Sequence, residues 1–255
     1  MQVIYHVILI DYTPLVLYLI LLIQGITEAL PVSSSMQVMM MCKMIGIAMP
    51  SKSFLALLHG ASLLGILVFF YRDIVRNSRY IAILLVANIP TLILAYFVKD
   101  MEAQSVYFTA INSILFGALL VRSDCIPAKR RIKDITAKDI VILALSQPLS
   151  IFCGVSRLGI CITVMRMLSF NRVSSLLLGF MMGIPTMVVA SGFGFLKNID
   201  LIRDIPGDFL IGSVITFCAT YLSLLLITKE IYKGSSAFLW FGIYRIATGI
   251  LVLML

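Results

Sequence analysis

Charged residues are scarce in this sequence of 255 residues. They make up 13% of it, against 61% hydrophobic residues, and the mean hydropathy is +1.07. A soluble protein of this length is about one quarter charged, so the composition excludes a soluble globular domain and predicts an integral membrane protein. Long apolar segments favour helices over a β-barrel, whose strands would alternate apolar and polar residues.

The sequence also lacks the paired cysteine spacing of a zinc or redox motif. Its five cysteines stand singly, mostly in apolar surroundings where a free cysteine behaves as a small hydrophobic residue. The formal net charge of +8 does not indicate nucleic-acid binding, because the basic residues lie in loops between apolar segments. In a membrane protein, such loop residues report orientation. We therefore expect contacts with membrane lipids and none with nucleic acid.

One polar stretch follows the first apolar segment. It reads Gln24-Gly-Ile-Thr-Glu28-Ala-Leu-Pro31-Val-Ser33-Ser34-Ser35. A carboxylate near the bilayer centre costs about 2.5–3.5 kcal/mol, so such residues are functional candidates. Gln24 and Glu28 are four residues apart and share a helix face, and Pro31 ends regular helix. Because irregular backbone at membrane depth must be buried in protein or line a watery cavity, the stretch predicts a site.

The apolar segments predict six membrane-spanning helices and two re-entrant helical hairpins. The first hairpin comprises residues 15–30 and 36–48, and the second comprises residues 140–152 and 160–168. A piece of about 13 residues at ~1.5 Å per residue cannot cross the ~30 Å of hydrocarbon. The six predicted spans are residues 54–71, 80–98, 106–121, 173–196, 209–228 and 237–255.

The order of these elements repeats within one membrane domain. Each half, approximately 14–121 and 139–255, holds one hairpin and three spans, and the basic loop 122–138 joins the halves. The aligned pairs are Gln24 with Gln147, Val32 with Val155, Ser33 with Ser156, and Ser34 with Arg157. Three crossings separate the hairpins, so they enter from opposite faces and their polar turns meet near the midplane. The expected fold is an all-α integral membrane protein with an inverted-topology repeat.

The loop charges predict the orientation of this fold. One side holds Arg72, Arg76, Arg79, Arg122, Lys129, Arg130, Arg131, Lys133, Lys138, Arg166, Arg172, Lys229 and Lys233. The other side holds only Lys43, Lys52, Lys99, Lys197 and Arg203. Positive loop residues collect on the cytoplasmic side. We therefore expect the first side to be cytoplasmic and both termini to face outward.

The two turns together would supply the groups of a phosphate site. Arg157 carries a planar cationic fork that suits phosphate oxygens, and serine hydroxyls and free amides at helix starts add donors. One serine could also be a nucleophile. Glu28 could hold a divalent metal with help from Gln24, since Mg²⁺ and Ca²⁺ favour oxygen ligands. Such a site suits an amphiphile with a phosphate or diphosphate head.

Structural interpretations of the same residues stay open. Glu28 and Arg157 could be an ion pair that only locks two loops, and the serines could be turn formers and caps. His59, flanked by apolar residues in a predicted span, is interpreted as a packed, hydrogen-bonded histidine rather than a catalyst. Arg245, late in the last span, would snorkel or pair internally.

At these residues the sequence resembles the undecaprenyl-diphosphate phosphatase family, also known through bacitracin resistance. The family pattern has Glu or Gln, three residues, Glu, and then Leu-Pro-Ile/Val-Ser-Ser-Ser/Thr. It is matched by Gln24, Glu28, Leu30, Pro31 and Ser33–Ser35. The second family pattern, Pro-Gly-x-Ser-Arg-Ser-Gly-Ala-Thr, is matched by Gly154, Ser156, Arg157 and Gly159. Weaker similarities extend over nearly the whole chain, including His59 and Tyr244-Arg245.

The resemblance implies a bacterial inner-membrane hydrolase that converts undecaprenyl diphosphate to the monophosphate, recycling the carrier for cell-wall precursors. It implies a metal-assisted site that opens toward the outer face, with Gln24 and Glu28 as ligands of Mg²⁺ or Ca²⁺. In this interpretation Ser34 is the nucleophile or phosphate-orienting hydroxyl, Arg157 stabilises the oxyanion, and Glu28 is metal ligand or base. The implied substrate-binding residues are Gln24, Ser33, Ser35, Gln37 and Ser156.

The sequence departs from the family where a Gly-His pair usually follows the serines. Here Met36-Gln37 stands there, and glutamine cannot transfer a proton as histidine does near neutral pH. In the second pattern Cys153, Leu158 and Cys161 replace Pro, Ser and Thr. These departures keep a rival function open, namely a polyprenyl-phosphate transporter or a catalytically degraded lipid-phosphate binder.

Overall fold

The structure is a computed structural model that describes residues 13–98, 104–204 and 206–254, without the side chains of Lys52 and Pro206. Apart from one isolated bridge between Arg130 and Phe170, these residues form helices and the loops that connect them. The predicted all-α membrane fold is therefore confirmed at the level of its helices. Lys99, the N-terminus and the last residue of the final predicted span lie outside the described residues.

The helices before the basic loop follow the predicted apolar segments. They are α2 (Pro14–Glu28), α3 (Ser34–Ile45), α4 (Lys52–Phe69), α5 (Tyr71–Arg76), η1 (Ser78–Tyr80), α6 (Ile81–Ala87), α7 (Ile89–Val98) and α8 (Val106–Asp124). The predicted span at 80–98 is divided at Asn88. Its side chain donates to the carbonyls of Leu84 and Met182, and Pro90, two residues on, has no backbone N–H to continue the helical ladder.

The helices after that loop begin with short pieces and end with long ones. They are η2 (Ile132–Asp134), α9 (Ala137–Ser146), η3 (Gln147–Ile151), α10 (Arg157–Met167), α11 (Arg172–Lys197), α12 (Ile199–Asp204), α13 (Pro206–Tyr232) and α14 (Ala237–Met254). Among the described residues, five helical segments are long and apolar enough to cross a membrane. The remaining predicted span corresponds to α4, whose apolar part, Ser53–Phe69, is shorter.

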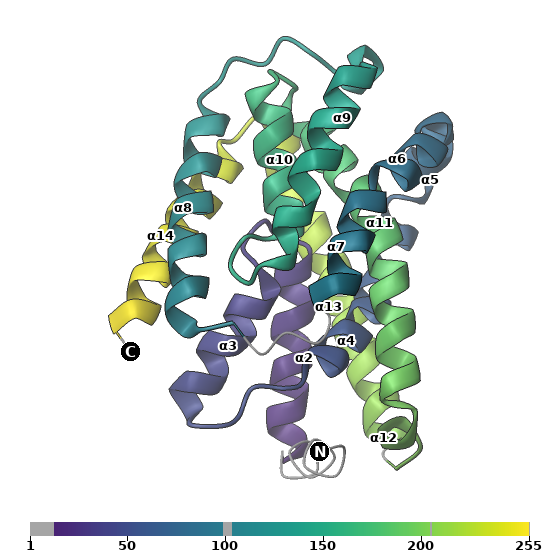
Figure 1. Cartoon of the computed structure of the whole chain (residues 1–255), viewed down its shortest axis with the longest axis vertical. Helices are drawn as coiled ribbons and strands as arrows, with labels where there is room; N and C mark the ends of the chain where they lie inside the picture. Colours follow the sequence, from purple (N-terminus) through teal and green to yellow (C-terminus); the bar gives the residue numbers. More distant parts are fainter. Residues whose placement is uncertain (1–12, 99–103, 205, 255) are drawn as a thin grey trace.

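Two pairs of short helices approach each other inside the bundle. Figure 1 shows α2 and α3 extending from one end of the bundle to its middle, and α9 and α10 from the opposite end. Long helices surround them, with α8 packed on α14, α4 on α11, and α13 on both α2 and α4. The polar turns of the two pairs therefore lie in the interior, between helices of both halves.

The basic elements gather at one end of this bundle. In Figure 1, the loop between α8 and α9 lies at the top and α5 at the upper right, whereas α12 lies at the bottom. These two elements, α5 and the loop, carry six of the thirteen arginines and lysines of the first predicted set: Arg72, Arg76, Lys129, Arg130, Arg131 and Lys133. This end of the bundle is therefore basic, and the assignment of the two sets to opposite sides of the membrane stays a prediction.

Close helix packing fixes α2 at the centre. A Cβ atom at Gly25 would lie 2.6 Å from the carbonyl oxygen of Thr216 on α13, so only glycine permits this contact. Buried hydroxyls of α13 donate to backbone carbonyls of α2: Thr216 donates to Leu21 and Thr220 donates to Gly25, at 3.1 and 2.9 Å. Small residues that let helix backbones approach are typical of membrane helix pairs. The packing sets the height and rotation of Gln24 and Glu28.

Candidate active site

The first turn connects α2 to α3 through the predicted polar stretch. Helix α2 ends at Glu28, and α3 begins at Ser34 after the left-handed backbone of Ser33, with φ 68°. Such a positive φ is uncommon for a residue other than glycine. It turns the chain so that the Ser34 hydroxyl, at the start of α3, faces back to the end of α2.

The second turn has the same construction. Helix α10 begins at Arg157 after the left-handed Ser156, with φ 67°, whose hydroxyl accepts from the backbone N–H of Gly159 at 3.1 Å. Gly154, with φ +90°, precedes it, and a Cβ there would lie 2.2 Å from the carbonyl oxygen of Thr109. Only glycine fits this turn. The predicted pairing of Ser33 with Ser156 therefore matches two residues of the same backbone conformation.

The two turns meet at the carboxylate of Glu28. An N–H of Arg157 donates to Glu28 Oε1 in an ion pair. The Ser34 hydroxyl donates to Glu28 Oε2 at 2.9 Å, and Gln24 Nε2 donates to the same oxygen at 3.0 Å. The Glu28 side chain is 7% exposed. Four predicted residues from both hairpins thus form one buried, hydrogen-bonded cluster.

A fifth residue, His59 of α4, joins this cluster. Its Nδ1 lies 3.2 Å from Glu28 Oε2 and 3.4 Å from Gln24 Nε2. From the sequence, His59 is expected to be a packed, hydrogen-bonded residue outside the site. The hydrogen bonding is confirmed, but the partner is the central carboxylate. A histidine within an apolar span was the available signal.

The Arg157 side chain is held from a third element. It donates to the hydroxyl of Thr186 on α11 at 3.3 Å. A Cβ at Gly183 would lie 3.4 Å from Arg157 Nε, so the glycine leaves room for the guanidinium. Among the described contacts, Glu28 and Thr186 use only part of the five N–H groups of arginine. The remaining donors suit phosphate oxygens.

Arg245 of α14 pairs internally, as one of its two sequence interpretations held. The residue is fully buried. It donates to the carbonyl oxygens of Gly154 and Val155 at 2.6 and 2.8 Å, and to that of Pro31 at 3.4 Å. Arg245 therefore connects the backbones of both turns.

The other predicted substrate-binding residues lie in the turns but contact different groups. The Ser33 and Ser35 hydroxyls are 3.3 Å apart. Gln37 is buried; its amide donates to the carbonyl of Val32 at 3.3 Å and accepts from the Tyr244 hydroxyl at 2.7 Å. Gln37 thus ties the first turn to α14, whereas Gln24 lies within the Glu28 cluster.

The donors present do not complete a site for the predicted divalent metal. Within the described residues, no group of three or more His, Cys, Asp or Glu side chains is arranged to hold a metal ion. Both oxygens of Glu28 accept hydrogen bonds, and Gln24 presents its N–H rather than its oxygen to that carboxylate. Mg²⁺ or Ca²⁺ at Glu28 and Gln24 therefore stays a prediction.

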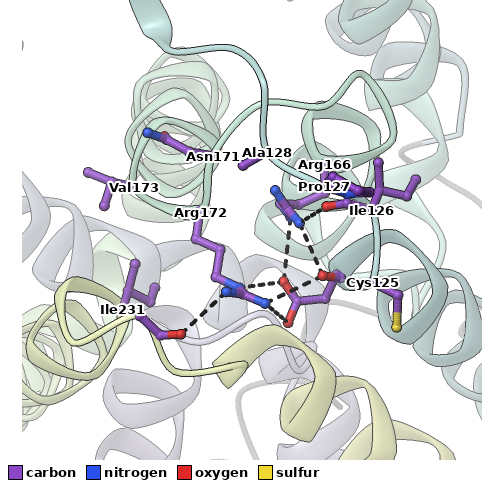
Figure 2. A pocket seen from close by; sticks show the side chains of 11 residues that line it. Cys125, Ile126, Pro127, Ala128, Arg166, Asn171, Arg172, Val173 and Ile231 are labelled. Carbon is purple, nitrogen blue, oxygen red and sulfur yellow. Dashed lines mark hydrogen bonds and ion pairs between the residues drawn. The ribbon is translucent and has the colours of Figure 1, made fainter.

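A cavity of about 410 Å³ lies elsewhere, at the end of the bundle with the basic loop. Figure 2 shows Arg166 and Arg172 in its wall. Arg172 binds the carboxylate of Asp124 at 2.7 Å, and Arg166 donates to the carbonyls of Asp124, Ile126 and Phe170. These contacts connect loops to helix ends, so we interpret the cluster as structural.

Comparisons with known proteins point to one family. The family model described as bacitracin resistance protein BacA matches residues 18–251. A relative named undecaprenyl-diphosphatase from Ruegeria sp. is 30% identical over 262 residues, covering 94% of this chain and 97% of the relative. A relative of the same name from Campylobacter curvus is 31% identical, covering 92% and 96%. A third, from Renibacterium salmoninarum, is 29% identical, covering 92% of each chain.

Proposed function

Because the chain belongs to the bacitracin resistance protein BacA family, we propose that it hydrolyses undecaprenyl diphosphate to undecaprenyl monophosphate and inorganic phosphate. The convergence of Glu28, Ser34 and Arg157 from two buried turns carries this proposal. The relatives named undecaprenyl-diphosphatase, which align over most of this chain, support the choice of substrate.

Arg157 binds the terminal phosphate. Its planar fork can donate hydrogen bonds to two phosphate oxygens at once, and its charge stabilises the negative charge that develops during transfer. The side chains of Arg157 and Glu28 are 17% and 7% exposed, and charges interact more strongly in such buried surroundings than in water. Thr186 and the space left by Gly183 hold the guanidinium in one orientation.

Ser34 and Glu28 carry out the transfer. As the Ser34 oxygen bonds to the terminal phosphorus, its proton passes to Glu28 Oε2, its hydrogen-bond acceptor at 2.9 Å. The bond from that phosphorus to the bridging oxygen breaks, and undecaprenyl monophosphate leaves. A water oxygen then bonds to the phosphorus and the bond from phosphorus to the Ser34 oxygen breaks. The proton held by Glu28 returns to the Ser34 oxygen, and inorganic phosphate leaves. In the alternative assignment, Ser34 only orients the phosphate and Glu28 takes the proton from the attacking water.

The protein is a multi-pass membrane protein, and we place it in the bacterial inner membrane with the site open to the outer face. The separation of basic loop residues toward one end of the bundle supports this orientation. The substrate's lipid tail would remain in the bilayer while its diphosphate reaches the two turns. Product formed there is the carrier used for cell-wall precursors.

The two turns belong to inverted repeats at approximately 14–121 and 139–255, joined by the loop 122–138. Helix pairs that approach from opposite ends support this division, as do the left-handed serines that precede α3 and α10. Inverted repeats with sites at their interface also occur in transporters, which is why transport stays the rival function.

Phosphate release from undecaprenyl diphosphate by the purified protein in detergent tests the proposal. We expect turnover by the wild type and loss of turnover in Ser34→Ala. Comparable turnover in Ser34→Ala would assign the attack to water. Binding of the lipid without phosphate release by the wild type, in the presence or absence of Mg²⁺ or Ca²⁺, would favour a transporter or a binder.

A further inference from the structure

His59 contacts the carboxylate of Glu28, but it has no role in the reaction steps proposed for Ser34, Glu28 and Arg157. Its Nδ1 and the Ser34 hydroxyl approach the same oxygen, Glu28 Oε2, at 3.2 and 2.9 Å. Gln24 Nε2 approaches that oxygen as well, at 3.0 Å. One oxygen therefore receives three neighbours from α2, α3 and α4, while Glu28 Oε1 faces Arg157.

The place of His59 is fixed by tight helix packing. A Cβ at Gly194 of α11 would lie 2.3 Å from the backbone nitrogen of Leu57, so α4 contacts the backbone of α11 directly. About two turns further along α4, a Cβ at Gly65 would lie 3.2 Å from the carbonyl oxygen of Phe217 on α13. Because α13 also packs on α2, the same contacts set the height of His59 and of Glu28. The imidazole is thus held on a rigid element.

The contact between His59 and Glu28 becomes important when phosphate binds, because Arg157 pairs with Glu28 and also binds the phosphate. Phosphate bound to the remaining N–H groups of Arg157 competes with Glu28 Oε1 for the positive charge, and a carboxylate held less firmly at Oε1 can rotate away from Ser34. Donors on α2 and α4 do not move with Arg157, since they belong to other helices. They can keep Glu28 Oε2 in place during the reaction.

We propose that His59 is a positioning residue that holds Glu28 Oε2 beside the Ser34 hydroxyl by a hydrogen bond through Nδ1. This inference rests on the proposed function for the task of Glu28, but the contact itself does not. His59 lies outside the two family sequence patterns, on helix α4. The imidazole acts through Glu28 and does not touch the phosphate.

Three variants distinguish positioning from packing and from proton transfer. His59→Asn keeps a donor at the position of Nδ1, His59→Gln moves the donor to about the position of Nε2, and His59→Leu removes it. We expect kcat to fall about 10²-fold in His59→Leu, because a small displacement of a reacting group costs about that much. KM should change little, since Arg157 is untouched. His59→Asn should restore most of kcat, and His59→Gln less of it.

Ser62→Ala on the same helix is the matched control. Within the part of the chain that the structure describes, the Ser62 hydroxyl is buried without a hydrogen-bond partner, so its removal should leave kcat unchanged. Wild-type kcat in His59→Leu would overturn the inference, because it would make His59 a packing residue. A His59→Asn variant as slow as His59→Leu would also overturn it, because only an imidazole function would then explain the loss.

A double-mutant cycle on Tm tests the contact between His59 and Glu28 without relying on enzyme activity. The Tm values of His59→Leu, Glu28→Gln and their combination are measured in the same detergent. If the two side chains interact, the Tm losses of the single variants will not add in the double variant. If the Tm losses are additive, His59 and Glu28 do not interact, and the inference is overturned even if the enzyme is active. Non-additive losses in a protein that releases no phosphate would uphold the contact while the proposed function fails.

Discussion

Arg245, fully buried in α14, donates a hydrogen bond of 2.6 Å to the carbonyl oxygen of Gly154 in the second turn. The same side chain reaches Val155 beside it and Pro31 in the first turn. Gly159 leaves the room that this requires, since a Cβ there would lie 2.7 Å from Arg245 Nη1. A single arginine therefore satisfies carbonyls that the turns leave outside any helix.

Replacing Arg245 should destabilise the whole site. In Arg245→Gln the carbonyls of both turns would lose donors in a buried place, and each unsatisfied group costs about 1–3 kcal/mol. We expect a clear fall in Tm and loss of phosphate release, with Arg245→Lys intermediate because an ammonium cannot span the same carbonyls. Arg203→Gln is the control, because this arginine is 72% exposed and surface ion pairs contribute little. Equal Tm values for the two glutamine variants would contradict the role.

Arg157→Lys should lose turnover while the protein stays folded. Lysine keeps the charge, but it lacks the planar fork that meets both phosphate and Glu28. We expect phosphate release to fall about 10²–10³-fold, as for other losses of transition-state donors. Near-normal kinetics with undecaprenyl diphosphate, at an unchanged Tm, would instead mark Arg157 as structural.

The sequence predicted the parts of the site whose geometry is local. The spacing of Gln24 and Glu28 fixes their shared helix face, and the serines after Pro31 start the next helix in any such turn. The meeting of Glu28 with Arg157 followed from counting the crossings between two short hairpins. These inferences required only helix length and topology.

The contribution of His59 could not be read from the sequence in the same way. Helix α4 is almost wholly apolar, so its pattern does not show which side faces the site. Backbone contacts at Gly194 and Gly65 set that rotation, and both involve residues distant in sequence. The sequence could not show whether Arg245 snorkels to the membrane interface or pairs inside the protein. Both arrangements are compatible with an arginine near the end of a spanning helix.

Glu28→Gln should abolish phosphate release and leave the membrane topology intact. The amide keeps the size of the side chain, but it removes the charge that pairs with Arg157 and the base that accepts the proton of Ser34. The same variant tests the predicted metal, since a divalent cation requires the carboxylate. Binding curves for Mg²⁺ or Ca²⁺ that superimpose for wild type and variant would exclude Glu28 as a ligand. Retained turnover would exclude it as the base.

Gln37→His examines the position where this chain departs from its family. The Gln37 amide donates to the carbonyl of Val32 and accepts from the Tyr244 hydroxyl, so it is already used in joining the first turn to α14. A histidine there would enter a buried space shaped for an amide, while Glu28 already has an imidazole neighbour in His59. We therefore expect Gln37→His to lower Tm and not to raise kcat.

This expectation is tested by measuring turnover and Tm in one detergent for the wild type, Gln37→His and Tyr244→Phe. Tyr244→Phe removes the hydroxyl that donates to Gln37 and should cost about 1 kcal/mol or somewhat more, the usual effect of leaving a buried acceptor without its donor. Tyr244→Phe is the matched control, because it removes the hydrogen bond between Tyr244 and Gln37 without adding a titratable group. An increase in kcat of about 10²-fold or more in Gln37→His, the range of a general acid or base, would contradict the expectation. It would show that a proton-transfer group is missing from this site and that His59 does not compensate for it.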